Sequence, residues 1–132
     1  MTRFDADDSR ERQKLFADAI AAHRTRASAF LTLEAEQDPD IDGADSPAPW
    51  VQFAENTFNV DVTDDELDRL NDVVDDFPAF RIDQLESPEE AEATNVRITA
   101  RSDANRLAAF VDRVFCDVYG RDEDYRAWVA AV

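Results

Sequence analysis

The sequence predicts an α+β domain in which helices cover one face of a mainly antiparallel sheet of about four strands. Apolar and polar residues alternate over 50–62 and again over 94–101, the period-two pattern of strands with one buried face. The second stretch leads into residues 103–119, whose apolar residues recur at helical spacing. Between the two, Thr63 and Glu66 have the spacing of a capping box that begins another helix. The expected order in a single domain over residues 1–132 is α-β-β-α-β-β-α-α.

The first expected helix extends from about Ser9 to Glu36, after residues 1–8, which we expect to be frayed. Asp8 and Glu11 have capping-box spacing, and apolar residues follow at intervals of three and four, a stripe that Glu34 continues. Residues 37–49 hold three prolines and a glycine among aspartates, so we expect a loop there.

The middle of the chain is expected to form a hairpin, a helix and two strands. Asn56 is placed at the hairpin turn because asparagine tolerates a left-handed conformation. The helix after Thr63 should end before Pro78, and Phe80 and Ile82 mark a third strand. An acidic connection over 86–93 leads to the fourth strand and the main helix, which should end at Gly120.

The chain carries 31 acidic and 14 basic residues, for a formal charge of −17. Most acids are aspartate and every base except Lys14 is arginine, a composition that resembles the proteins of halophilic archaea. Carboxylates repel little at molar salt, where the Debye length is about 3 Å. With no apolar run near the length of a membrane span and no signal peptide, we expect a soluble, cytoplasmic protein.

The segment with Asp38, Asp40 and Asp42 opens like an EF-hand calcium loop, D-x-D-x-D-G. The match fails at the twelfth position, where Pro49 replaces the bidentate glutamate. These aspartates are therefore only weak metal candidates, and a solvated acidic loop is the favoured reading. We expect no cofactor, because the two glycines form no phosphate-binding loop.

His23 and Cys116 are the only histidine and cysteine. We expect His23 at the edge of the core and Cys116 in a contact between helices. A nucleophilic cysteine near the end of a helix is disfavoured by the negative end of the dipole. No catalytic residue is assigned, and the sequence favours a protein that is not an enzyme.

Four arginines of the C-terminal third form a possible basic patch: Arg97, Arg101, Arg106 and Arg113. Salt bridges to nearby carboxylates are the favoured reading of these side chains. The strand lacks the interleaved aromatic residues of an RNA-binding sheet, so nucleic-acid binding is the third of three candidate functions.

Asp122 is expected to cap a last short helix, and four residues of its apolar face form a possible interface: Tyr125, Trp128, Val129 and Val132. The leading expectation is a non-catalytic interaction or regulatory module that binds itself, as a homodimer, or another protein. The alternative is a small-molecule-binding domain or enzyme with a pocket between the sheet and the helices.

Overall fold

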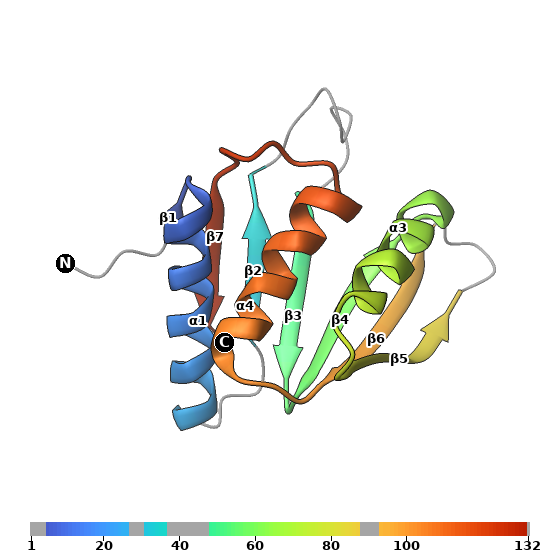
Figure 1. Cartoon of the computed structure of the whole chain (residues 1–132), viewed down its shortest axis with the longest axis horizontal. Coiled ribbons are helices and arrows are strands. Elements are labelled where there is room, and N and C mark those ends of the chain that lie inside the picture. Colours follow the sequence, from blue (N-terminus) through green and yellow to red (C-terminus); the bar gives the residue numbers. More distant parts are fainter. Residues whose placement is uncertain (1–4, 27–30, 37–47, 88–92, 132) are drawn as a thin grey trace.

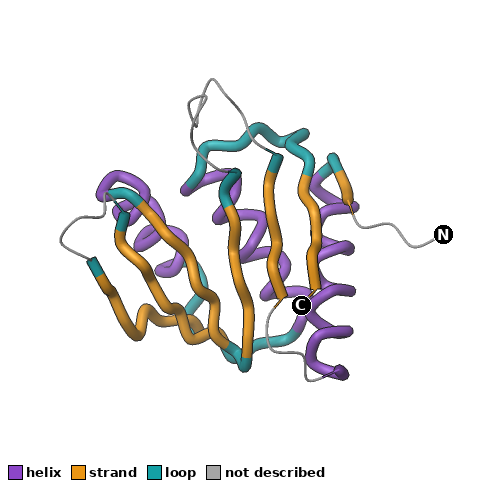
Figure 2. The backbone as a smooth tube through the Cα atoms, turned by 180° about the vertical axis from the view of Figure 1, so that it is seen from behind, coloured by secondary structure: helices purple, strands orange, loops and turns teal. Residues whose placement is uncertain are grey.

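A computed structural model describes residues 5–26, 31–36, 48–87 and 93–131 of the chain. It confirms an α+β fold with helices on one side of an antiparallel sheet, but the sheet has seven strands where about four were expected. The strand order is β1-β7-β2-β3-β4-β6-β5, and every neighbouring pair is antiparallel. Helices α1, α4 and α3 lie side by side across one face (Figure 1). Seen from behind, the strands are in front of all of these helices (Figure 2).

The elements with both strong periodicity and clear end signals were predicted correctly. Strands β3 (Trp50–Ala54) and β4 (Thr57–Val62) form the hairpin, with Glu55 and Asn56 both at positive φ in its turn. Helix α3 (Asp64–Asp75) begins with the full capping box of Thr63 and Glu66. Strand β6 (Thr94–Ala100) leads into α4 (Ala104–Arg113).

The end of the main helix also follows the expected local chemistry. The Asp103 side chain caps α4, which continues into the π-helical turn η1 (Val114–Val118). Gly120 has φ of 72°, the left-handed conformation that glycine adopts without a steric cost.

The prediction of one long first helix was wrong. Helix α1 spans Ser9–Arg26, with the Asp8 carboxylate accepting a hydrogen bond from the Glu11 amide. Strand β2 (Leu31–Ala35) follows, with the side chains of Leu31, Leu33 and Ala35 buried. The alternation over 31–35 was hidden because Leu31 and Glu34 also fit a helical spacing. Glu34 therefore projects from a strand rather than from the end of a helix.

The expected last helix was also wrong, because Ala127–Ala131 form strand β7 between β1 and β2. Strand β1 (Asp5–Ala6) lies at the edge of the sheet, in the segment expected to be frayed, and pairs with β7. The other edge strand, β5 (Phe80–Glu86), is longer than expected and has a register shift between Ile82 and Gln84. Residues 37–47 and 88–92, where a loop and part of the acidic connection were expected, lie outside the described residues.

The core lies between the sheet and the helices. Its centre is a chain of aromatic contacts from Phe53 through Phe58 to Phe110, with ring centroids 4.9 and 5.2 Å apart. Helix α1 packs against α4, and α3 packs against η1. Since this packing occupies only one side of the sheet, the side chains of alternate strand residues project from the other side.

Candidate functional site

No described helix covers the face of the sheet turned away from α1, α3 and α4 (Figure 2). We call it the open face. In β2, β3, β4 and β6, each residue on this face alternates with a buried one. Residues that project from the open face include Asp5, Thr32, Glu34, Trp50, Gln52, Ala54, Thr57, Asn59, Asp61, Arg81, Asn95, Arg97, Thr99 and Trp128.

Three side chains form a row across the open face that we call the tryptophan row. Glu34 of β2 lies directly opposite Trp50 of β3 and directly opposite Trp128 of β7. The carboxylate residue is therefore flanked by an indole on either side. Trp128 is 44% exposed, one of two large apolar residues with that degree of exposure among the described residues. No ion pair joins Glu34 to a basic side chain within the described ranges.

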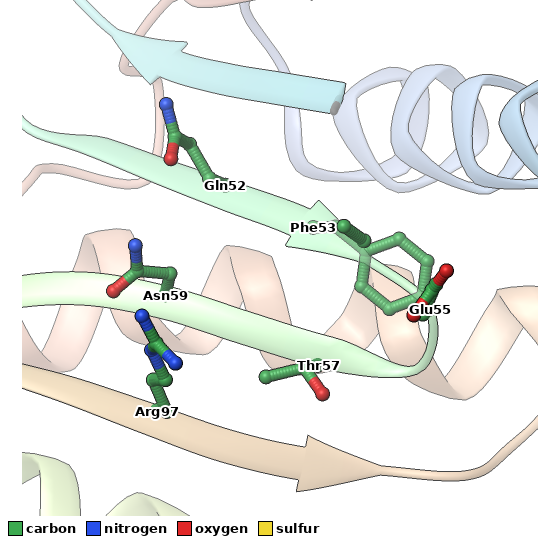
Figure 3. A pocket seen from close by; sticks show the side chains of 7 residues that line it. Gln52, Phe53, Glu55, Thr57, Asn59 and Arg97 are labelled. Carbon is green, nitrogen blue, oxygen red and sulfur yellow. The ribbon is translucent and has the colours of Figure 1, made fainter. Parts of the chain in front are cut away.

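A polar row crosses the neighbouring positions, formed by Thr32, Gln52, Asn59 and Arg97 in mutual register. Figure 3 shows Gln52, Asn59 and Arg97 projecting from three adjacent strands. They border an open hollow of about 320 Å³, whose lining residues are Gln52, Phe53, Ala54, Glu55, Thr57, Asn59 and Arg97.

Hydrogen bonds order part of this polar row. The Asn95 side-chain amide donates to Oδ1 of Asn59 at 2.7 Å and to Oδ1 of Asp61 at 2.8 Å. Arg97 has no carboxylate partner in the part of the chain that the structure describes. An exposed guanidinium beside amide groups can accept an anionic or polar group from outside the chain.

The possible basic patch does not converge on one surface. Arg97 projects from the open face of β6, whereas Arg106 and Arg113 belong to α4 on the opposite side of the sheet. Arg113 pairs with Asp76 at 2.9 Å and with Asp117 at 2.7 Å, and these contacts raise its pKa. Arg101 follows β6 and is exposed. The described geometry therefore offers no continuous positive surface made of these four residues.

The expected apolar interface at the C-terminus is divided by the strand geometry. Tyr125 is buried, Trp128 lies on the open face, and Val129 packs against the core on the other side. Val132 lies outside the described residues, as do the weak metal candidates Asp38, Asp40 and Asp42. The described residues contain no group of three or more His, Cys, Asp or Glu side chains able to hold a metal ion.

A buried ion pair on the helix side joins the two ends of the chain. Arg12 of α1, 1% exposed, donates through Nε to Oδ1 of Asp112 at 2.9 Å and through Nη1 to the Tyr125 carbonyl at 2.9 Å. The Tyr125 hydroxyl donates to the same Asp112 oxygen at 2.8 Å. Burial alone lowers the pKa of Arg12, but the hydrogen bond and charge of Asp112 outweigh it, so this pKa is raised. Because every member is enclosed and bonded, we assign the cluster a structural role.

Cys116 and His23 have the environments of structural residues. Burial, with the negative charge of Asp112, raises the pKa of the Cys116 thiol to about 11, which disfavours the reactive thiolate. His23 is buried with its ring 5.8 Å from that of Phe53, and burial followed by the charge of Arg24 lowers its pKa. His23 belongs to α1 and Cys116 to η1, and no described contact joins them.

Sequence reasoning missed the tryptophan row and the polar row. Trp50 and Gln52 were assigned to a strand, but the surface that they form was not predicted. Trp128 was assigned to a helix. The available signal was the alternation over 31–35, which makes Glu34 a strand residue between two pairing partners. The register that places both tryptophans beside it depends on contacts between segments far apart in the sequence.

Among the described residues, no helix combines the length and apolar composition needed to cross a membrane. A family model described as "Family of unknown function (DUF7975)" matches residues 1–132. Neither the curated proteins nor the solved structures contain a match to the chain.

Proposed function

We propose that this chain, which belongs to the family of unknown function DUF7975, is a non-catalytic interaction module that binds a partner protein through the open face. The observation that carries the proposal is the tryptophan row. Two indoles project from a sheet surface that no described helix covers, while twenty-eight other apolar residues form a closed core on the helix side. Tryptophan is enriched among the residues that dominate protein–protein binding energy.

The face is a better candidate than the edge of the sheet. The exposed edge strand β5 carries Arg81 and Asp83 and a register shift beside Asp83, devices that discourage pairing with another strand. Leu85 of this strand is 53% exposed but is a single apolar residue. The tryptophan row instead combines two aromatic anchors with polar neighbours, the composition of an interface core and rim.

We further propose that the acidic surface adapts the module to a cytoplasm of molar salt. Six of the twelve residues of α3 are acidic, and most of these side chains point to solvent. Under such conditions long-range attraction contributes little, so contacts at short range would select the partner. Apolar and aromatic anchors are suited to that environment because they do not depend on unscreened charge.

The proposal is tested by partner retention on an immobilised chain at high salt. Trp50→Ala/Trp128→Ala should weaken partner binding by about 30-fold or more, the effect of losing one interface anchor of about 2 kcal/mol or greater. Leu85→Ala is the matched control, because it removes the other exposed large apolar side chain and should retain the partner. Light scattering on the same proteins shows whether the partner is a second copy. Equal retention by the double variant and the control would contradict the proposal.

A second candidate is binding of a small carboxylate-bearing molecule in the hollow beside Arg97. What favours it is a guanidinium without a described carboxylate partner, with the amide residue Asn59 directly opposite it and Gln52 on the next strand. The hollow lies on the open face, not between the sheet and the helices where a pocket was expected. This candidate requires no protein partner. It therefore predicts that the immobilised wild-type chain and the double tryptophan variant retain the same proteins.

A further inference from the structure

From the tryptophan row we infer the chemistry of the partner: an arginine side chain of the partner protein inserts between Trp50 and Trp128 and pairs with Glu34. This inference rests on the proposed function and goes beyond it by naming the group that is recognised. It starts from the two register pairs that place one carboxylate residue between two indoles.

The spacing of the row suits a planar cation. Neighbouring strands lie about 4.8 Å apart, so the strands of the two tryptophans are separated by about 9.6 Å with Glu34 midway. Two indoles that project from the strands on either side of Glu34 can both approach a cation held above its carboxylate, because an aromatic face attracts a cation out to ~6 Å from the ring centre. The Glu34 carboxylate can add an ion pair below the same group.

The described side chains leave this position without a cation of their own. Arg126 lies beside one of the two indoles, with its guanidinium carbon 6.0 Å from the centre of the Trp128 ring. That guanidinium is already bound by the carboxylates of Asp5 and Asp7 on the side of β1. Arg126 therefore lies near the Trp128 ring but is paired with carboxylates on the β1 side, and no described ion pair occupies Glu34.

Arginine suits the site better than lysine. Its guanidinium is planar, stacks on aromatic rings and is weakly hydrated, so it loses less hydration when it enters between two indoles. A guanidinium enclosed between two indoles is partly buried, and a partly buried charge pair is screened by dissolved salt less than an exposed one is. We therefore expect the tryptophan row to bind arginine in preference to lysine at the molar salt concentration proposed for the module.

The site can be observed directly because Trp50 and Trp128 are the only tryptophans of the chain. Their two indole N–H resonances are the readout in a titration of the folded chain with N-acetylargininamide at high salt. We expect both resonances to shift and saturate, with a dissociation constant in the tens of millimolar because a single side chain supplies few contacts. The citrulline analogue, which is neutral and of similar shape, should cause no saturable shift.

Glu34→Gln should weaken N-acetylargininamide binding at least 5-fold while leaving the indole resonances in place. Asp68→Asn on the outer side of α3 removes the same charge from the far side of the sheet and should retain wild-type affinity. Equal shifts with the citrulline analogue, or equal affinity in Glu34→Gln, would overturn the inference.

Partner retention separates this inference from the proposed function. Loss of the partner from the double tryptophan variant together with full retention by Glu34→Gln would leave the open face as the interaction surface but reject the arginine. Retention of the partner by both variants would reject the proposed function itself. Loss in both, with retention by Asp68→Asn, is the expected result.

Discussion

Transfer from about 3 M to about 0.1 M salt should unfold the chain or lower its melting temperature by more than about 10 °C. The Debye length increases from a few ångströms to about 10 Å over this range, so exposed carboxylates begin to repel one another. The net charge of −17 is concentrated in residues 34–92, which hold 20 acids and two bases. For a chain of this size, such a shift corresponds to a few kcal/mol, a large share of the stability of a typical domain.

Helix α3 is where this repulsion should be strongest. Asp64, Asp68, Asp72 and Asp76 follow one another at intervals of four residues, and like charges at that spacing destabilise a helix by roughly 0.2–0.5 kcal/mol per pair. Acids near its C-terminus also oppose the helix dipole, and its last turn holds no basic residue. The Arg113 contact with Asp76 offsets only part of this cost.

Thermal melts followed by far-UV circular dichroism provide the measurement. Asp68→Asn/Asp72→Asn should recover part of the stability lost at low salt. Asp122→Asn/Glu123→Gln removes two exposed charges outside α3 and should recover less. A wild-type spectrum and melting temperature that do not change between the two salt concentrations would contradict the proposed adaptation to molar salt.

Loss of the buried carboxylate in Asp112→Ala should destabilise the fold by about 3–5 kcal/mol, the cost of leaving a buried charge without its partner. Arg12 would remain enclosed, and the Tyr125 hydroxyl would lose its acceptor. Because Arg12 belongs to the first helix and Tyr125 precedes the last strand, the effect should loosen the packing of both ends of the chain. Urea denaturation at high salt measures the change in free energy of unfolding.

Two further variants make this second prediction specific. Asp117→Asn removes a half-exposed carboxylate from its ion pair with Arg113, four residues earlier, and should cost no more than about 1 kcal/mol. Arg12→Met/Asp112→Leu removes both buried charges and should restore much of the stability that Asp112→Ala loses. A cost for Asp112→Ala no greater than that for Asp117→Asn would show that the buried pair is dispensable.

The elements that could be predicted from the sequence are those in which periodicity and end signals agree. Thr63 and Asp103 cap helices whose apolar stripes begin at once, and Asn56 occupies a left-handed turn between two alternating segments. Strands β2 and β7 are five residues each and gave no comparable end signals. Leu31 fits a helical stripe as well as a strand, and only its pairing with Phe53 selects the strand.

The candidate site was unpredictable for the same reason. Its three central residues lie at positions 34, 50 and 128, and only β2 and its two neighbours bring them together. The sequence marked Trp128 as a possible interface residue, but in a helix with a different set of neighbours. Arg12 and Asp112 were overlooked because charged residues in so acidic a chain give no indication of which will be buried.

The central claim is that the open face binds a partner protein, and photo-crosslinking from the folded chain tests it most directly. A benzoylphenylalanine side chain replaces Gln52 or Thr32 on the open face, or Lys14 or Asn71 on the exposed outer surfaces of α1 and α3. Irradiation in cells that natively produce the chain should give a discrete adduct from positions 52 and 32 and none from positions 14 and 71. Adducts confined to the helix positions, or no adduct from the open face, would contradict the account.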